Sequence, residues 1–253
     1  MNILYLGDVY GEMGIKAIEK YLPKAKKKYP YDLLVINGEN VSGGIGLTKD
    51  DYARLMRFGA HLITLGNHAF SKDEIFDYID AAKVIRPLNF PRGVPGEGMK
   101  TINVNGTRVA ILQVMGRIFM NDPLDNPFTA LDDALQGLDA DIVLVDLHGE
   151  ATSEKLALAH YLDGRVDAAV GSHTHVQTND AMRLPGGTLY MSDIGMCGAL
   201  HGILGADRGI IVKRFTTGLP IRMKPETSKA LQMNGVYIDT DTKTIKAVAY
   251  RDE

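Results

Sequence analysis

The sequence predicts an α/β fold, because short apolar strands alternate with helical segments along its first half. The strand segments are continuous apolar runs, which are typical of strands that are covered on both faces. The second half contains a hairpin signal and further strand-like segments. These observations favour two β layers with helices packed against them, in one domain over residues 1–253.

Three strand–helix units are predicted in the first half of the chain. Strands at 2–6, 32–37 and 61–65 are followed by helices at 12–28, from near residue 49, and after Ser71. Lysines at the end of the first helix suit the negative end of its dipole, and Pro30 ends it. Thr48 with Asp51, and Ser71 with Glu74, have the spacing of capping boxes at helix starts.

The second half is predicted to begin with a β-hairpin over 100–114, in which Asn105-Gly106 forms the turn. A loop over 121–127 then leads to a helix from near residue 128. The remaining expected elements are strands at 142–147 and 166–170 separated by a helix at 152–162, then strands at 188–192, 209–215, 235–239 and 244–250.

The composition excludes several classes of protein. The 28 Lys+Arg and 31 Asp+Glu residues give a net charge of −3, and 45% of residues are hydrophobic. A disordered or collagen-like chain is therefore excluded, and stable nucleic-acid binding is not expected. The single cysteine, Cys197, cannot form an internal disulfide, so the fold must depend on packing.

The chain contains no apolar run that approaches the roughly 18 residues needed to span a membrane. Its N-terminus passes directly from MNILYL into GDVYG, without the basic and apolar regions of a secretory signal. We therefore expect a cytoplasmic protein that does not associate with membranes.

Polar residues beside glycine follow five of the predicted strands. These segments are Gly7-Asp8, Asn37-Gly38-Glu39-Asn40, Gly66-Asn67-His68, His148-Gly149 and Gly171-Ser172-His173-Thr174-His175. Ligands of open α/β sheets bind at the carboxyl ends of the strands, so we expect these side chains to converge there.

The converging side chains are carboxylates, amides and imidazoles, with no thiolate. Such donors suit manganese, iron or zinc. Seven or eight groups are too many for one ion. They would suit two ions that share a carboxylate at the roughly 3.5–4 Å separation of two-metal hydrolases.

These motifs, in this order, resemble those of the calcineurin-like metallophosphoesterases, over residue 2 to at least residue 175. Two positions differ from the usual pattern of that superfamily. Tyr10 replaces a histidine in the first motif, and Gly38-Glu39 replaces Gly-Asp in the second. GDVYG, NGEN, GNHAF and the Gly-rich segment 192–205 resemble the bacterial YmdB-like branch.

The resemblance implies a sandwich of two mixed β-sheets flanked by helices, with a centre of two metal ions. Asp8, His175 and Asn40 would hold one ion, Asn67, His148 and His173 would hold the other, and Glu39 would bridge them. His68 would be the general acid. Because Tyr10 removes one imidazole, iron or manganese is favoured over zinc.

The activity implied is that of a phosphodiesterase, with a 2′,3′-cyclic nucleotide such as 2′,3′-cyclic AMP as the best single substrate. A metal-bridging hydroxide would attack phosphorus while His68 protonates the leaving oxygen. One alternative is a phosphomonoesterase acting on nucleotides or phosphoproteins. Another is a regulatory protein with a structural metal centre, although a structural centre has no need of His68. A homo-oligomer, and contact of His201 with substrate, are left open.

Overall fold

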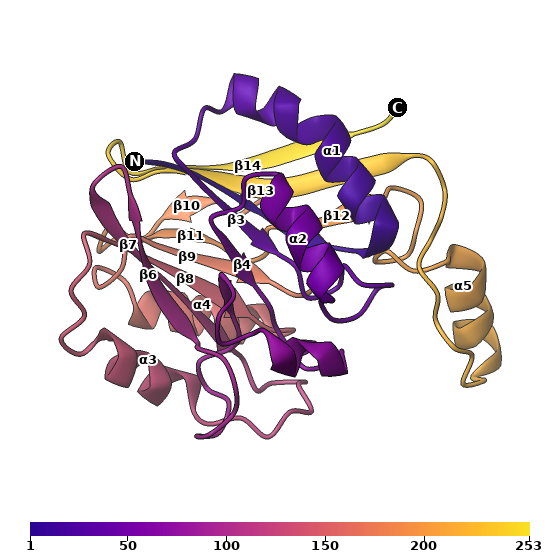
Figure 1. Cartoon of the computed structure of the whole chain (residues 1–253), viewed down its shortest axis with the longest axis horizontal. Coiled ribbons are helices and arrows are strands. Elements are labelled where there is room, and N and C mark those ends of the chain that lie inside the picture. The colour runs from indigo at the N-terminus through magenta and orange to yellow at the C-terminus, as the bar shows by residue number, and fades with distance from the viewer.

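The computed structural model describes all 253 residues, Met1 to Glu253, and has two β-sheets with helices on their outer sides (Figure 1). The predicted α/β sandwich of two mixed sheets is therefore confirmed. None of the helices combines the length and apolar character needed to cross a membrane.

The first sheet contains eight strands in the order β2-β12-β13-β1-β3-β4-β5, with β14 paired to β13. These strands are β1 (Asn2–Leu6), β2 (Asp8–Val9), β3 (Leu33–Asn37), β4 (Leu62–Thr64), β5 (Val84–Ile85), β12 (Met196–Ala199), β13 (Leu231–Asp239) and β14 (Thr244–Arg251). Strands β1, β3, β4 and β5 are parallel, whereas β13 runs antiparallel to β1. The predicted parallel core thus lies on one side of β1.

The second sheet contains six strands in the order β10-β11-β9-β8-β7-β6. They are β6 (Met99–Val104), β7 (Thr107–Met115), β8 (Ile142–His148), β9 (Ala168–Ser172), β10 (Met182–Arg183) and β11 (Leu189–Met191). Strands β7, β8, β9 and β11 are parallel, and β6 and β10 form antiparallel edges. The β6–β7 hairpin turns through Asn105 and Gly106, both with positive φ, as predicted.

Side chains alternate along the central strands, so that both faces of each sheet are buried. Ile3 and Tyr5 of β1 pack between the sheets with Ile111 of β7, whereas Leu4 and Leu6 face the outer helices. Burial of both faces explains why these strands are continuous apolar runs.

The helices form the two outer layers, apart from α5. They are α1 (Gly11–Lys28), α2 (Lys49–Arg57), α3 (Pro127–Leu135), α4 (Thr152–Tyr161) and α5 (Arg208–Thr217), with a short 3₁₀ helix η1 (Asp73–Asp77). Residues of α1 and α2 share a core with the first sheet, and residues of α3 and α4 share one with the second. Figure 1 shows α5 standing away from both sheets.

Two predicted helix starts had different outcomes. The side chain of Thr48 accepts a hydrogen bond from the backbone N–H of Asp51, so Thr48 caps α2 as predicted. The capping box at Ser71 and Glu74 is wrong. The segment forms η1, whose N-cap is Lys72 without a side-chain bond, so Ser71 lies one residue too early.

The strand predicted at 209–215 is also wrong, because this segment lies within α5. The side chain of Asp207 accepts from the N–H of Ile210 at 2.8 Å, and Gly218 ends the helix with a φ of 69°. These capping interactions at the two ends of the helix outweigh the strand propensity of its β-branched residues, which have no neighbouring strand to pair with. Strand β12 was not predicted, because its sequence was interpreted as part of a Gly-rich loop.

Candidate active site

The predicted site residues lie where parallel strands of both sheets end. Asp8 begins β2 just after β1, while Glu39 and Asn40 follow β3. Asn67 and His68 come three and four residues after the last residue of β4. His148 is the last residue of β8, and His173 follows β9 directly. Strands β8 and β9 end later in the sequence than predicted, so His148 and Ser172 are their last residues.

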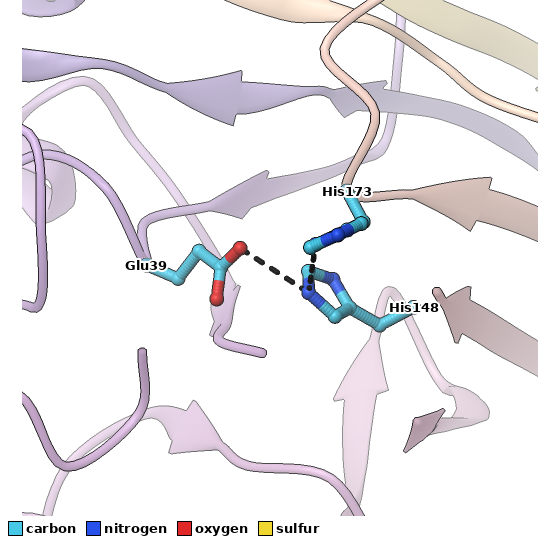
Figure 2. Close-up of side chains that lie close together, drawn as sticks. All are labelled: Glu39, His148 and His173. Carbon is cyan, nitrogen blue, oxygen red and sulfur yellow. Dashed lines mark hydrogen bonds and ion pairs between the residues drawn. The ribbon is translucent and has the colours of Figure 1, made fainter. Parts of the chain in front are cut away.

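One group of donors contains Glu39, His148 and His173, whose ligand atoms all lie within 4.8 Å of one another (Figure 2). His148 Nε2 is 3.2 Å from Glu39 Oε1 and 3.2 Å from His173 Nδ1. The side-chain oxygen of Asn67 lies 2.9 Å from the same His148 nitrogen. The structure therefore brings together the residues predicted to hold one ion.

A second group contains Asp8, Asn40 and His175. His175 Nε2 lies 3.6 Å from Asp8 Oδ1 and 3.2 Å from the Asn40 amide nitrogen. That amide nitrogen is also 3.3 Å from Asp8 Oδ1 and 3.3 Å from Glu39 Oε1. Glu39 thus contacts both groups, as its predicted bridging role requires, although the metal-binding roles themselves remain predictions.

Close packing of these groups depends on Gly66. A Cβ atom at this position would lie 2.3 Å from His148 Cε1 and 2.4 Å from Glu39 Oε2. Both atoms belong to donor side chains, so any larger residue at position 66 would displace them. This contact explains why the strand-end motif contains glycine.

The buried carboxylates make the site electrostatically suited to a cation. Burial, and then the negative charge of Asp8, raise the pKa of Glu39 well above its usual value. Burial also tends to raise the pKa of Asp8, but the hydrogen bond and charge of His175 outweigh it and lower that pKa. Two buried acids in contact with one set of donors would be stabilised by a bound positive ion.

Two of the three imidazoles in the donor groups are in the form that binds metals. Burial lowers the pKa of His148 and of His173, so both rings are neutral and carry a free lone pair. The donor set of oxygen and neutral nitrogen atoms therefore fits one or two transition-metal ions.

A buried chain of hydrogen bonds behind His148 was not predicted. His148 Nδ1 lies 2.9 Å from Ser172 Oγ, which donates at 2.7 Å to Asp146 Oδ1. Asp146 Oδ2 in turn accepts from Tyr5 and Gln113. These hydrogen bonds orient the His148 ring so that its Nε2 atom faces the site. An aspartate inside the apolar strand IVLVDLH was the signal that could have revealed it.

Two further contacts orient the other histidines. Glu150 Oε2 lies 3.2 Å from His173 Nε2, which leaves Nδ1 facing His148. The carbonyl oxygen of Leu204 lies 2.9 Å from His175 Nδ1, which leaves Nε2 facing Asp8. His173 and His175 have positive φ values of 104° and 65°, so the backbone is strained at both residues.

A buried ion pair supports this strained segment. Lys155 Nζ lies 3.0 Å from Asp193 Oδ2, and both side chains are almost completely buried. The same carboxylate oxygen accepts from the backbone N–H and the hydroxyl of Thr174, at 2.9 and 2.8 Å. Asp193 therefore fixes the residue that lies between His173 and His175.

We expect Asp193→Asn to destabilise the metal-free protein by about 3–5 kcal/mol, because it leaves the Lys155 charge buried without its partner. Urea unfolding measures this change. The matched control is Asp139→Asn, since Asp139 pairs with Arg108 on the surface and has a side chain that is 79% exposed. Its effect should stay below about 1 kcal/mol. Equal effects of the two variants would contradict the supporting role of Asp193.

The donor residues open into a cavity of about 550 Å³. Glu39, Asn40, His68, His173 and His175 line one part of it. Tyr10, the residue at the altered motif position, also lines the cavity. His201, whose contact with substrate was left open, is exposed and is not among the lining residues.

Donors from two sheets that meet beside an open cavity are the arrangement expected of the calcineurin-like metallophosphoesterases, which the motifs resemble. The chain belongs to the YmdB-like protein family, whose family model matches residues 4–252. The resemblance inferred from the motifs is thereby confirmed.

The relatives agree with this assignment. A 2′,3′-cyclic-nucleotide 2′-phosphodiesterase of Bacillus subtilis is 47% identical over 98% of this chain and 94% of its own length. A crystal structure of a hypothetical protein from Thermus thermophilus has a TM-score of 0.94 at 43% identity, with both chains fully covered. The structure of a novel phosphatase from Mycoplasma pneumoniae has a TM-score of 0.90 at 33% identity, covering 100% of this chain and 93% of that one.

Proposed function

We propose that the protein is a metal-dependent phosphodiesterase that hydrolyses 2′,3′-cyclic nucleotides. The observation that carries the proposal is the pair of donor groups that share Glu39 at the wall of the cavity. The similarity to the Bacillus subtilis enzyme supports the choice of substrate.

In this proposal, Asp8, Asn40 and His175 hold one ion, Asn67, His148 and His173 hold the other, and Glu39 contacts both. The oxygen-rich donor set favours iron or manganese over zinc. Two such ions, when bound, supply an activated water and screen the charge of the phosphoryl oxygens. The chain positions the substrate and delivers the proton.

His68 is suited to deliver that proton to the leaving oxygen. Its Nδ1 lies 2.7 Å from Asn40 Oδ1, and its backbone N–H donates to Glu39 Oε2 at 3.0 Å. The ring also lines the cavity. Nε2 is therefore the nitrogen left free to meet the leaving group, so the ring can act without serving as a metal ligand.

The acid role of His68 requires a protonated ring. Burial, with a smaller effect of His173, lowers the pKa of His68 to about 4, so the ring is neutral at pH 7 before substrate binds. The negative charge of a bound phosphodiester favours the imidazolium form, whose Nε2 hydrogen is the proton for the leaving oxygen. Asn40 would hold its ion through the amide oxygen, which a half-turn of the amide directs toward Asp8 and Glu39.

The charges around the cavity favour a diester over a monoester. No lysine or arginine lines the cavity, and Glu150 adds a carboxylate to its wall. A phosphodiester carries one negative charge and a phosphomonoester close to two, so apart from the metal ions the cavity offers no cationic side chain to the second charge of a monoester. A phosphomonoesterase is the second candidate, because the Mycoplasma pneumoniae relative is described as a phosphatase.

The test compares kcat/KM for 2′,3′-cyclic AMP with that for 2′-AMP and 3′-AMP, with the same added metal. We expect the cyclic diester to be preferred by at least about tenfold, which corresponds to a difference of about 1.4 kcal/mol in transition-state stabilisation. Removal of metal by a chelator should abolish turnover, and Mn²⁺ or Fe²⁺ should restore it.

A clear preference for the monoesters would favour the phosphatase instead. A protein that binds metal but turns over neither class of ester would favour a regulatory role.

A further inference from the structure

The cavity continues beyond the donor residues onto an apolar wall. Residues Ile45, Leu204, Phe215 and Met223 line this part of it. Their exposed fractions are 41%, 50%, 81% and 51%, respectively. Large apolar side chains that line a cavity and remain exposed gain free energy when a ligand covers them.

The wall has a defined position relative to the donor residues. Leu204, whose φ is 52°, supplies the carbonyl oxygen that accepts from His175 Nδ1. The ring of Tyr10 packs against Gly44 and Gly205, where added Cβ atoms would lie 3.0 and 2.4 Å from ring atoms. The segment that carries Leu204, Phe215 and Met223 is therefore attached to the donor group at one end.

The side chains of this wall provide an apolar surface. The four wall residues contain no side-chain hydrogen-bond donor, and Thr174, a polar residue of the same cavity, already donates to Asp193. Phe215 is the one phenylalanine among the lining residues, and it lies on α5. Such a surface can bind the face of a planar ring without forming hydrogen bonds to the edge of that ring.

We propose that the wall formed by Ile45, Leu204, Phe215 and Met223 binds the nucleobase of the substrate, with Phe215 stacking on its face. This inference rests on the proposed function, because the donor groups must hold the cyclic phosphate while the base reaches the wall. The volume of about 550 Å³ is within the usual range for sites that enclose a small ligand.

The test uses two substrates, 2′,3′-cyclic AMP and the methyl riboside 2′,3′-cyclic phosphate, which has the same ring but no base. We expect wild-type protein to prefer the nucleotide. Phe215→Ala should lower kcat/KM for 2′,3′-cyclic AMP about tenfold, mainly through KM, since loss of one stacking contact has an effect of this size. The value for the riboside should not change.

Two variants act as controls. Leu219→Ala removes a side chain that is 54% exposed but does not line the cavity, so it should leave both substrates unaffected. Phe215→Tyr keeps the aromatic ring and should retain activity close to wild type. Light scattering on each variant measures its mass in solution.

Three results would overturn the base-binding wall while leaving the proposed function intact. They are equal turnover of both substrates by wild-type protein, an equal loss on both in Phe215→Ala, and a fall in molecular mass in that variant. The last would show that α5 contacts a second copy of the chain. Absence of turnover on either substrate would instead contradict the proposed function.

Discussion

Glu39→Gln is expected to lower the affinity for both metal ions by at least about 100-fold, since loss of a group that merely supports a ligand already costs 10- to 100-fold. The substitution keeps the shape of the side chain but removes the negative charge that both donor groups share. Oε2 of Glu39 accepts from the backbone N–H of His68, so the oxygen of the new amide would be held there. Its NH₂ group would then point toward His148, where an ion is expected to bind.

Metal content per chain after gel filtration measures this effect, together with kcat/KM for 2′,3′-cyclic AMP. The matched control is Glu19→Gln on the exposed face of α1, which should keep both ions and full activity. Two tightly bound ions and undiminished activity in Glu39→Gln would rule out the bridging role.

His68→Ala is expected to reduce turnover of 2′,3′-cyclic AMP by about 10²–10⁴-fold, the usual contribution of a general acid. Metal content should stay the same, because the ring contacts Asn40 and does not belong to either donor group. The loss should be distinctly smaller for a nitrophenyl phosphodiester, since nitrophenolate leaves with little help from a proton.

His160→Ala, which changes an exposed histidine on α4, provides the control for this substitution. It should match wild type on both substrates. If His68→Ala loses an ion, the residue is a ligand. If it loses both activities equally, the ring positions the phosphate and does not act as the acid.

Much of the fold could be predicted because strands such as β1 and β8 are buried on both faces. Double burial produces apolar runs that stand out in the sequence, and parallel strands bring their carboxyl ends to one edge. The convergence of Asp8, Glu39 and His148 followed from that rule alone. The motif glycines added precision, since Gly66 is where two donor side chains approach the backbone most closely.

Features that depend on distant partners could not be predicted in this way. The run Ile210-Ile211-Val212 has strong strand propensity, but the cap at Asp207 and the lack of a pairing strand make it a helix. The roles of Asp146 and Lys155 depend on contacts across strands and helices, with Ser172 and Asp193 as their partners. The apolar wall likewise depends on α5 approaching the loop that contains Ile45.

The origin of the donors in two different sheets has a consequence for the order of folding. Asp8 and Glu39 come from the sheet that contains β1, whereas His148 and His173 come from the sheet that contains β8. Ions of the proposed centre would bind only after the two sheets have docked, so their binding free energy would stabilise the docked state alone. Contacts between residues so far apart in the chain also tend to form late. A growing chain that has not yet reached His148 would have no complete centre, so assembly of the sandwich would precede its loading with metal.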